Sequence, residues 1–227
     1  MLSYYGSKYR DAKYYPNPVH RRVVELFAGG AGYSLFHWRS MVEISDVDPY
    51  LSDAWRFLMR SSRDPTLVSC LKAPVDAVDE VPEDARNFVG YWMHAASSNS
   101  PKRFVSARCQ WTSASRDRIA KFIPRLSHWK YFECDWRLMA LSLLGSERST
   151  VFVDLPYVGA GNYYRHSLEE RDYLALADVC VALHREGHQM IVCERAGAEW
   201  LPFRPLYVGR SMQTNRDGVE VVWTGEG

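Results

Sequence analysis

Asp154, Pro156 and Tyr157 follow closely on an uncharged run, Thr150–Val153, that predicts a buried β-strand. Ligands of open α/β sheets bind at the carboxyl ends of the strands, so these side chains are expected where chemistry takes place. A carboxylate that accepts hydrogen bonds, beside a flat aromatic ring, suits a planar group that carries an amine. The sequence therefore predicts a site for a planar, amine-bearing substrate at the end of this strand.

A glycine-rich turn, Ala28-Gly-Gly-Ala-Gly32, connects the first predicted strand (22–27) to a predicted helix (33–39). Glycine lacks a Cβ atom and tolerates positive φ, so such a turn lets a backbone approach a cofactor closely. Leu35 stands where a nicotinamide-binding G-x-G-x-x-G needs its third glycine, and the Gly-Lys-Ser/Thr of a phosphate loop is absent. The turn fits enzymes that use S-adenosylmethionine; an ordinary tight turn is the alternative.

Two acids, Asp46 and Asp48, follow the second predicted strand (41–44). A carboxylate at this position can accept hydrogen bonds from both ribose hydroxyls of an adenosyl cofactor. The alternative is that one of them caps the helix predicted at 51–61, because aspartate is favoured at helix N-caps. The sequence thus predicts an adenosyl-binding acid here and leaves open which of the two it is.

Strands and helices alternate along most of the chain, which predicts an α/β fold with a mostly parallel sheet that ends in an antiparallel hairpin. Ser167 to Glu170 matches a capping box and predicts a helix at 168–185 that ends at Gly187. Strand periodicity is weak at 62–128, so this region is interpreted as a small, mainly helical insert in a domain formed by residues 1–61 and 129–227. Further strands are expected at 130–134, 189–193, 205–210 and 218–224, and further helices at 83–96, 115–123 and 136–144.

The composition is that of an ordinary globular protein, with 227 residues of which 47% are hydrophobic and 24% charged. The sequence has no run of 18 apolar residues and no signal-peptide pattern, so we expect a cytoplasmic protein without a membrane partner. The five cysteines form no C-x-x-C pair, which predicts free thiols and no zinc site.

Charge is segregated within the insert although the net charge is only +1. Residues 101–130 contain eight basic side chains and one acid, whereas residues 76–84 contain five acids and no base. This segregation predicts one face turned toward a polyanion and a solvated far face. For any single charge, a merely solvated helix face is the alternative.

Several motifs, met in one order along both ends of the chain, resemble those of the D12 class of N6-adenine DNA methyltransferases, the Dam family with its short phage-borne members. Tyr4-Tyr-Gly-Ser-Lys8 resembles the family's N-terminal aromatic-x-Gly-Gly-Lys motif, which folds over the cofactor. Val24 to Gly32 resembles its glycine motif, and Ser45-Asp46-Val-Asp48 resembles its ribose-binding acid.

The second half of the chain continues the resemblance. Phe132-Glu-Cys-Asp135-Trp136 resembles the segment that contacts the adenine of the cofactor, and Asp154-Leu-Pro-Tyr157 resembles the catalytic Asp-Pro-Pro-Tyr. Tyr163-Tyr-Arg-His166, followed by Asp172, resembles the stretch after the catalytic motif of phage members, and Gly218 to Trp223 resembles the last strand. Residues 62–128 match poorly, and the family keeps its target-recognition insert there.

The resemblance implies a Rossmann-like methyltransferase fold, S-adenosylmethionine as the cofactor and double-stranded DNA as the partner. The implied cofactor-binding residues are Tyr4, Lys8, Phe27, Gly29, Gly30, Gly32, Asp46, Asp48, Asp135 and Trp136. For contacts to DNA we select basic and aromatic residues, namely Lys102, Arg103, Trp111 and Arg165. A monomer in a bacterial or phage-infected cell, with a cognate restriction endonuclease as a second partner, completes the expectation.

The resemblance also implies a mechanism at Asp154-Leu155-Pro156-Tyr157. The Asp154 carboxylate and the Leu155 carbonyl accept the two protons of the adenine amine, Pro156 stiffens the turn, and Tyr157 stacks on a base flipped out of the duplex. Leu155 departs from the family, which has proline there. The alternatives are a methyltransferase for another base or for RNA, and a DNA-binding relative without turnover.

Overall fold

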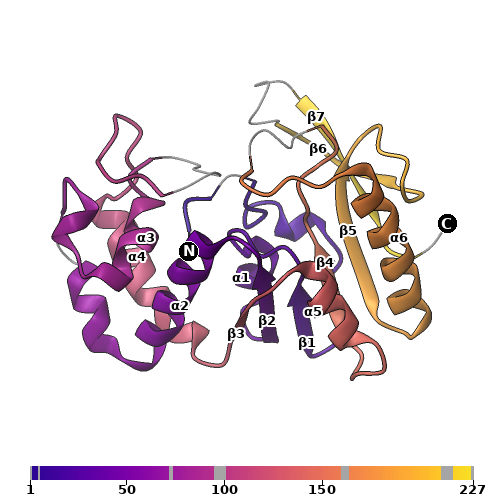
Figure 1. The fold of residues 1–227 in the computed structure, drawn as a ribbon, viewed down its shortest axis with the longest axis horizontal. Helices are drawn as coiled ribbons and strands as arrows, with labels where there is room; N and C mark the ends of the chain where they lie inside the picture. Colours follow the sequence, from indigo (N-terminus) through magenta and orange to yellow (C-terminus); the bar gives the residue numbers. More distant parts are fainter. Residues whose placement is uncertain are drawn as a thin grey trace.

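A computed structural model describes residues 2–4, 6–71, 74–94, 101–159, 164–210 and 217–225. Its centre is a seven-stranded sheet in the order β3-β2-β1-β4-β5-β7-β6 (Figure 1). The first five strands along the chain are parallel, and β7 runs antiparallel to both of its neighbours. The strands are β1 (Arg22–Glu25), β2 (Met41–Asp46), β3 (Lys130–Glu133), β4 (Thr150–Val153), β5 (Gln189–Arg195), β6 (Arg204–Arg210) and β7 (Asp217–Trp223).

The order of the strands reverses at β1, which pairs with β2 on one side and β4 on the other. Val23 lies opposite Val42 of β2 and Thr150 of β4. The loops after β1, β2 and β4 therefore leave the sheet at the same edge, which is where open α/β sheets bind their ligands. The predicted Rossmann-like α/β fold, mostly parallel and finished by an antiparallel hairpin, is confirmed.

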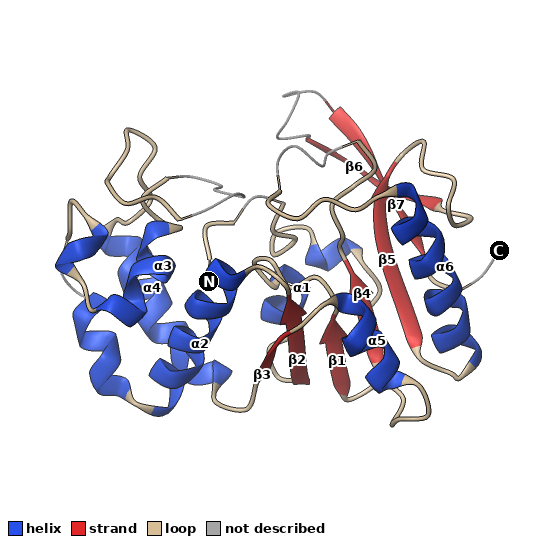
Figure 2. Cartoon of the chain, in the orientation of Figure 1, coloured by secondary structure: helices blue, strands red, loops and turns tan. Residues whose placement is uncertain are grey.

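Helices cover both faces of the sheet. Successive residues of the central strands point to opposite faces, and the apolar side chains on each face pack against helices. Val23 packs with α1 (Gly32–Phe36) and α2 (Pro49–Arg63), whereas Val24 packs with α5 (Trp136–Leu143) and α6 (Glu170–Arg185). Figures 1 and 2 show α5 and α6 in front of the strands. None of the helices in the described part of the chain has the length and apolar character needed to cross a bilayer.

The insert packs on the far side of α2, away from the sheet (Figure 1). Phe57 of α2 packs on Phe88 of the insert with ring centroids 5.6 Å apart, and Trp55 stacks on Trp129 at 6.0 Å. The insert therefore extends the hydrophobic core of the sheet. Its helical pieces are short: η2 (Pro65–Leu71), η3 (Val78–Glu80), η4 (Glu83–Ala85), α3 (Arg86–Gly90), α4 (Ser113–Phe122) and η5 (Ile123–Leu126), while one further turn, η1 (Ala12–Tyr14), lies near the N-terminus.

The helix predicted at 83–96 is wrong in length, and residues 95–100 lie outside the described part. The α-helix ends at Gly90, where the chain from Pro101 to Lys102 crosses it. A Cβ atom at Gly90 would lie 2.6 Å from the Pro101 Cβ atom, and the Lys102 amide donates to the Gly90 carbonyl over 3.0 Å. Tertiary packing thus replaces the last turns that the periodicity predicted.

The capping box predicted at Ser167 lies two residues later. The N-cap of α6 is Glu169, whose amide donates to the Asp172 carboxylate over 2.9 Å, and Ser167 is exposed. Asp172 also pairs with Arg137 of α5, which fixes the first turn of α6 against the neighbouring helix. The helix reaches Arg185, and Gly187 follows with a φ of 92°, as the sequence predicts for its C-terminal end.

Candidate active site

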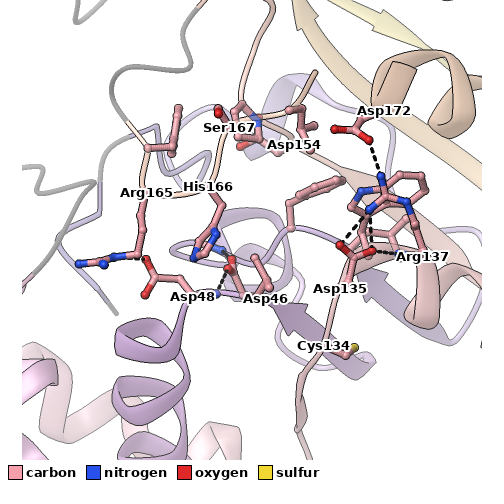
Figure 3. Close-up of a pocket in the computed structure, with 18 of the residues that line it drawn as sticks. Asp46, Asp48, Cys134, Asp135, Arg137, Asp154, Arg165, His166, Ser167 and Asp172 are labelled. Atoms are coloured by element: carbon pink, nitrogen blue, oxygen red, sulfur yellow. Dashed lines mark hydrogen bonds and ion pairs between the residues drawn. The ribbon is translucent and has the colours of Figure 1, made fainter. Parts of the chain in front are cut away.

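A cleft of about 220 Å³ lies at the carboxyl edge of the sheet. The loops after β1, β2, β3 and β4 line it, and residues 164–168 contribute a further wall. Figure 3 shows Asp46, Asp48 and Arg165 on one side and Asp135 with Arg137 on the other. Of the predicted cofactor and catalytic residues, the cleft is lined by Tyr4, Phe27, Gly29, Asp46, Asp48, Asp135, Trp136, Asp154 and Pro156.

Asp46 and Asp48 have different tasks at the end of β2. Asp48 caps α2: its Oδ1 atom accepts from the Tyr50 amide over 2.8 Å, while Oδ2 lies 3.7 Å from the Arg165 guanidinium. The Asp46 carboxylate accepts from the amides of Gly29 (2.9 Å) and Asp48 (3.0 Å) at the mouth of the glycine turn. Burial raises the pKa of Asp46 despite these bonds. Asp46 is therefore the acid placed to receive further donors from a ligand.

The glycine turn gives room to the N-terminal segment of the chain itself. A Cβ atom at Gly29, whose φ is 44°, would lie 2.9 Å from the Tyr4 ring, and one at Gly32 would lie 2.4 Å from the Tyr9 amide nitrogen. Gly30 faces Ser7 in the same way, and neither Gly30 nor Gly32 lines the cleft. The turn thus brings Tyr4 to the cleft wall instead of leaving an open approach at each glycine.

Glu25, at the end of β1, stabilises the conformation of the glycine turn. Its side chain is buried and accepts from the Ser34 amide over 2.6 Å at the start of α1. Burial raises the pKa of Glu25 to about 8, with the Ser34 hydrogen bond opposing the rise. From the other side, the Trp55 indole donates to the Gly29 carbonyl over 3.0 Å. The turn is therefore fixed by contacts from a strand and a helix.

Asp135 and Trp136 form the wall after β3. The Asp135 carboxylate caps α5 by accepting from the Arg137 amide over 2.8 Å, and it also pairs with the Arg137 side chain. Trp136 is buried against Phe27, with ring centroids 6.2 Å apart. Its Nε1 atom is buried and has no hydrogen-bond partner among the described residues. The wall therefore offers two aromatic rings.

Asp154 follows β4 and has a charged environment on its inner side. The Lys8 ammonium lies 3.5 Å from its Oδ1 atom and 3.0 Å from the Glu220 carboxylate of β7. Burial raises the pKa of Asp154 to about 6, with Lys8 opposing the rise and Glu220 adding to it. The carboxylate is thus ionised at neutral pH and can accept a proton as the pH falls toward 6.

The two residues after Asp154 are held by α5 and α6. Leu155 is 2% exposed and packs in the core on that face of the sheet, where Trp136 and Tyr173 also lie. The Pro156 carbonyl accepts from the Tyr173 hydroxyl over 2.8 Å. Leucine at the position of the family's proline therefore anchors the turn by its side chain.

Lys8 and Tyr157 lie behind the cleft wall. The Tyr157 hydroxyl bonds to both Lys8 and Glu220, and the Lys8 ammonium lies 4.7 Å from the centre of the Tyr157 ring. Burial, with the charges of Asp154 and Glu220, raises the pKa of Tyr157 well above its usual value. Lys8, predicted as a cofactor ligand, contacts the predicted catalytic residues Asp154 and Tyr157 and is not part of the cleft lining.

The residues selected for DNA contacts lie in two places, the cleft wall and the insert. Arg165 is in the cleft wall, stacked 4.5 Å over Tyr50, and Lys102 and Arg103 are exposed in the insert, where Arg103 pairs with Asp79 at 2.6 Å. Trp111 corrects the prediction, because its side chain is 5% exposed and packs on Phe88 and Trp92. A ring buried in that position is not accessible to DNA. Tyr163 lies outside the described residues.

Glu220, Tyr15 and Glu25 contact or support the site without having been predicted as site residues. A sequence signal exists for Glu220, the single acid in the run Val-Glu-Val-Val-Trp of a strand. A charge in such a run has a buried partner or an exposed face, and the alternation alone does not decide between them. Tyr15 has no such signal, because its hydroxyl meets the Glu220 carboxylate only through the fold (2.6 Å).

Among solved structures, the chain is similar to two of the rRNA methyltransferase AviRa from Streptomyces viridochromogenes, with TM-scores of 0.49 and 0.47 at 14% and 15% identity. These alignments cover 95% and 94% of this chain and 81% and 80% of that one. A conserved hypothetical protein from Streptococcus pyogenes is similar with a TM-score of 0.38 at 10% identity, over 90% of this chain and 86% of that one. No protein-family model and no curated protein matches the sequence. Likenesses this distant indicate neither an activity nor a substrate.

Proposed function

We propose that the protein transfers a methyl group from S-adenosylmethionine to the N6 amine of adenine in DNA. One observation carries the proposal. The Asp154 motif after β4, the Asp46 acid after β2 and the Asp135–Trp136 wall after β3 line a single cleft at the switch point of the sheet. An acceptor for an amine and a pocket suited to an adenosyl group thus share one space. The ordered motifs of the D12 class support the choice of adenine in DNA.

The donors and acceptors of the cleft fit an adenosyl cofactor. Asp46 keeps acceptor capacity beyond its two backbone donors, since each carboxylate oxygen has two lone pairs, and it would bind the ribose hydroxyls. Phe27 and Trp136 would flank the adenine ring. Held there, S-adenosylmethionine would supply an electrophilic methyl group, with the neutral thioether as the leaving group.

The chain's own task is to position the amine and to take its proton. The ionised Asp154 carboxylate and the Leu155 carbonyl would accept the two N–H groups and direct the nitrogen lone pair toward the methyl group. No donor among the described residues reaches the Leu155 carbonyl, so it is available for this bond. After transfer, the nitrogen carries a positive charge, and one of its protons passes to Asp154 and then to solvent.

Stacking on Tyr157 would use the face of its ring that Lys8 does not cover. Lys8 occupies one face, so a base extruded from the duplex would lie against the other. Because the hydroxyl is already bonded to Lys8 and Glu220, the ring is held in place before a base arrives. This arrangement limits the freedom that the aromatic side chain loses on binding.

Methyl transfer can be measured directly with methyl-labelled S-adenosylmethionine and mixed-sequence duplex DNA, followed by digestion to nucleosides. We expect the label in N6-methyldeoxyadenosine. In Asp154→Asn, which removes the charge of the side chain and keeps its shape, we expect the rate of methyl transfer to fall by about 10²–10⁴-fold. Asp178→Asn, an exposed site on α6, is the matched control. Label in methylated cytosine or in RNA alone, or no label over a range of salts and sequences, would refute adenine in DNA as the substrate.

A further inference from the structure

One oxygen of Glu220 receives three donors, two from the N-terminal segment and one from the turn after β4. Oε1 accepts from the Lys8 ammonium (3.0 Å), from the Tyr15 hydroxyl (2.6 Å) and from the Tyr157 hydroxyl. The Glu220 side chain is only 13% exposed. A protonated carboxyl group has fewer acceptor positions and would add a donor of its own, so three incoming donors indicate an ionised carboxylate.

Lys8 connects this carboxylate to Asp154. Its ammonium group lies between the Glu220 and Asp154 carboxylates, and its own side chain is 10% exposed. Burial alone would lower the pKa of Lys8, but the charges of Asp154 and Glu220 outweigh burial and raise it. Lys8 is therefore a permanent cation that two buried anions share. Its place is fixed because its backbone packs against Gly32, where a Cβ atom would clash.

Both functional members of the Asp154–Tyr157 motif thus depend on Glu220. The carboxylate binds the Tyr157 hydroxyl directly and reaches Asp154 through Lys8. Glu220 does not line the cleft among the described residues, so it touches neither the cofactor space nor the space for a base. Its register in β7 places it opposite Arg195, the last residue of β5, and opposite Tyr207 of β6.

We propose that Glu220 is a positioning residue for methyl transfer, which fixes the Tyr157 ring through its hydroxyl and the Asp154 carboxylate through Lys8. The proposal rests on the proposed function, because positioning has a meaning only for a reaction at Asp154. It differs from a purely structural role in two respects. It predicts a loss of turnover at unchanged cofactor affinity, and it predicts a change in the protonation behaviour of Asp154.

The protonation behaviour follows from the signs of the charges. The negative charge of Glu220 raises the pKa of Asp154, so its removal lowers that pKa. The positive charge of Lys8 lowers the pKa of Asp154, so its removal raises that pKa. A site that merely loosens would respond to both changes in the same direction. The ionisable groups that interact with Asp154 from the surrounding elements are Lys8, Tyr15, Glu25, Tyr157, Cys193 and Glu220.

The test compares Glu220→Gln, Glu220→Ala and Lys8→Met with the wild-type protein and with Glu199→Gln, an exposed acid, as control. We expect Glu220→Gln to lower kcat by about 10- to 100-fold with KM for the cofactor unchanged, and Glu220→Ala to lower it further, because misplaced groups cost this much. The acid limb of the pH–rate profile moves to lower pH in Glu220→Gln and to higher pH in Lys8→Met. Wild-type kcat in both Glu220 variants overturns the proposal.

A second readout separates this proposal from the proposed function. Carbon-13 NMR of labelled aspartate carboxyl groups, with the Asp154 signal assigned by its absence in Asp154→Asn, measures the pKa of Asp154 without any turnover. Opposite shifts in Glu220→Gln and Lys8→Met support the network even where no nucleic acid is methylated, in which case only the proposed function fails. An unchanged pKa in both folded variants, or a loss of kcat that merely follows a loss of folded protein, overturns the positioning role.

Discussion

At the scale of single residues, protonation of the buried Glu25 carboxyl group is coupled to the free energy of unfolding. It is 2% exposed, and burial raises its pKa to about 8. Between the unfolded value near 4.5 and about 8, the folded protein holds a proton that the unfolded chain has lost. Stability therefore falls as the pH rises through this window, because the unfolded state binds fewer protons there.

Glu25→Gln removes this pH dependence while its amide oxygen still accepts from Ser34. We expect the variant to match the wild-type protein near pH 4.5 and to exceed it increasingly up to pH 8, by at most about 5 kcal/mol. Urea unfolding at several pH values measures the difference. Parallel stability curves for the two proteins would show that Glu25 is ionised in the folded state.

Leu155 shows how one residue can depart from a motif and keep its place. In the family that the sequence resembles, proline stiffens this position through its ring. Here the side chain is packed in the core against residues of α5 and α6, and the following carbonyl is tied to Tyr173. A buried side chain restrains the turn through packing, whereas a proline restrains it through a fixed φ. Leucine and proline can therefore both restrain this turn, although a comparison of the motifs alone shows only a mismatch.

At the scale of elements, α2 connects the cleft to the insert, and its first turn is part of both. Asp48 caps the helix at the Tyr50 amide and pairs with Arg165 from the wall of residues 164–168. On the same helix, the Trp55 indole donates a hydrogen bond to the glycine turn, and the Phe57 ring packs against the insert. A change at its N-terminus therefore reaches the wall of the cleft.

Two substitutions separate the two tasks of Asp48. Asparagine caps helices as well as aspartate does, whereas alanine costs about 1 kcal/mol. Both remove the charge that pairs with Arg165, so the difference between Asp48→Asn and Asp48→Ala isolates the cap. We expect Asp48→Ala to be the less stable of the two by about 1 kcal/mol in urea unfolding. Equal stabilities would mean that the Tyr50 bond contributes nothing to the helix.

Elements were predictable from the sequence where the pattern is local. The strands around Val23, Ile44 and Phe152 and the helix after Trp136 follow from apolar runs and period, and their alternation predicts the sheet. The helix ends in the insert were not predictable. The helix α3 ends at Gly90 because another part of the chain crosses it there, and no local signal in the sequence reveals this crossing. The start of α6 was misplaced because Ser167 and Glu169 both begin a plausible capping box.

The candidate site divides in the same way. Asp154, Asp46 and the glycine turn stand next to predicted strand ends, so topology alone gathers them in one cleft. The partners of Asp154 come from distant parts of the chain, and only the folded structure shows that Lys8 meets Glu220 and that Tyr157 turns toward both. Trp111 failed as a DNA contact because polar sequence neighbours did not reveal its burial.

At the scale of the whole molecule, the insert and the sheet share one hydrophobic core through α2. Trp111 lies in the insert part of that core, against Phe88 and Trp92. Loss of packing there should therefore be felt by the sheet as well. A shared core of this kind favours a single cooperative unfolding transition over separate ones.

Trp111→Ala tests this continuity. We expect it to lower the free energy of unfolding by about 3–5 kcal/mol, as large-to-small changes in cores do, and to leave one transition. Phe104→Ala, in the same region but at a side chain that is 62% exposed, is the matched control with an effect within about 0.5 kcal/mol. Unfolding in urea is followed by far-UV circular dichroism and by tryptophan fluorescence. Two separated midpoints would show that the insert unfolds independently.

The contact between Lys8 and Glu220 has a consequence for the synthesis of the protein. The residues it joins are separated by most of the chain, and β7, which carries Glu220, occupies the gap between β5 and the earlier strand β6. Domains begin to fold from the N-terminal side as the ribosome extends the chain. Lys8 and Asp154 then emerge before Glu220, and the charged network around Lys8 is completed only once β7 has been synthesised. The ion pair between Lys8 and Glu220 therefore forms late, after the other strands of the sheet have been synthesised.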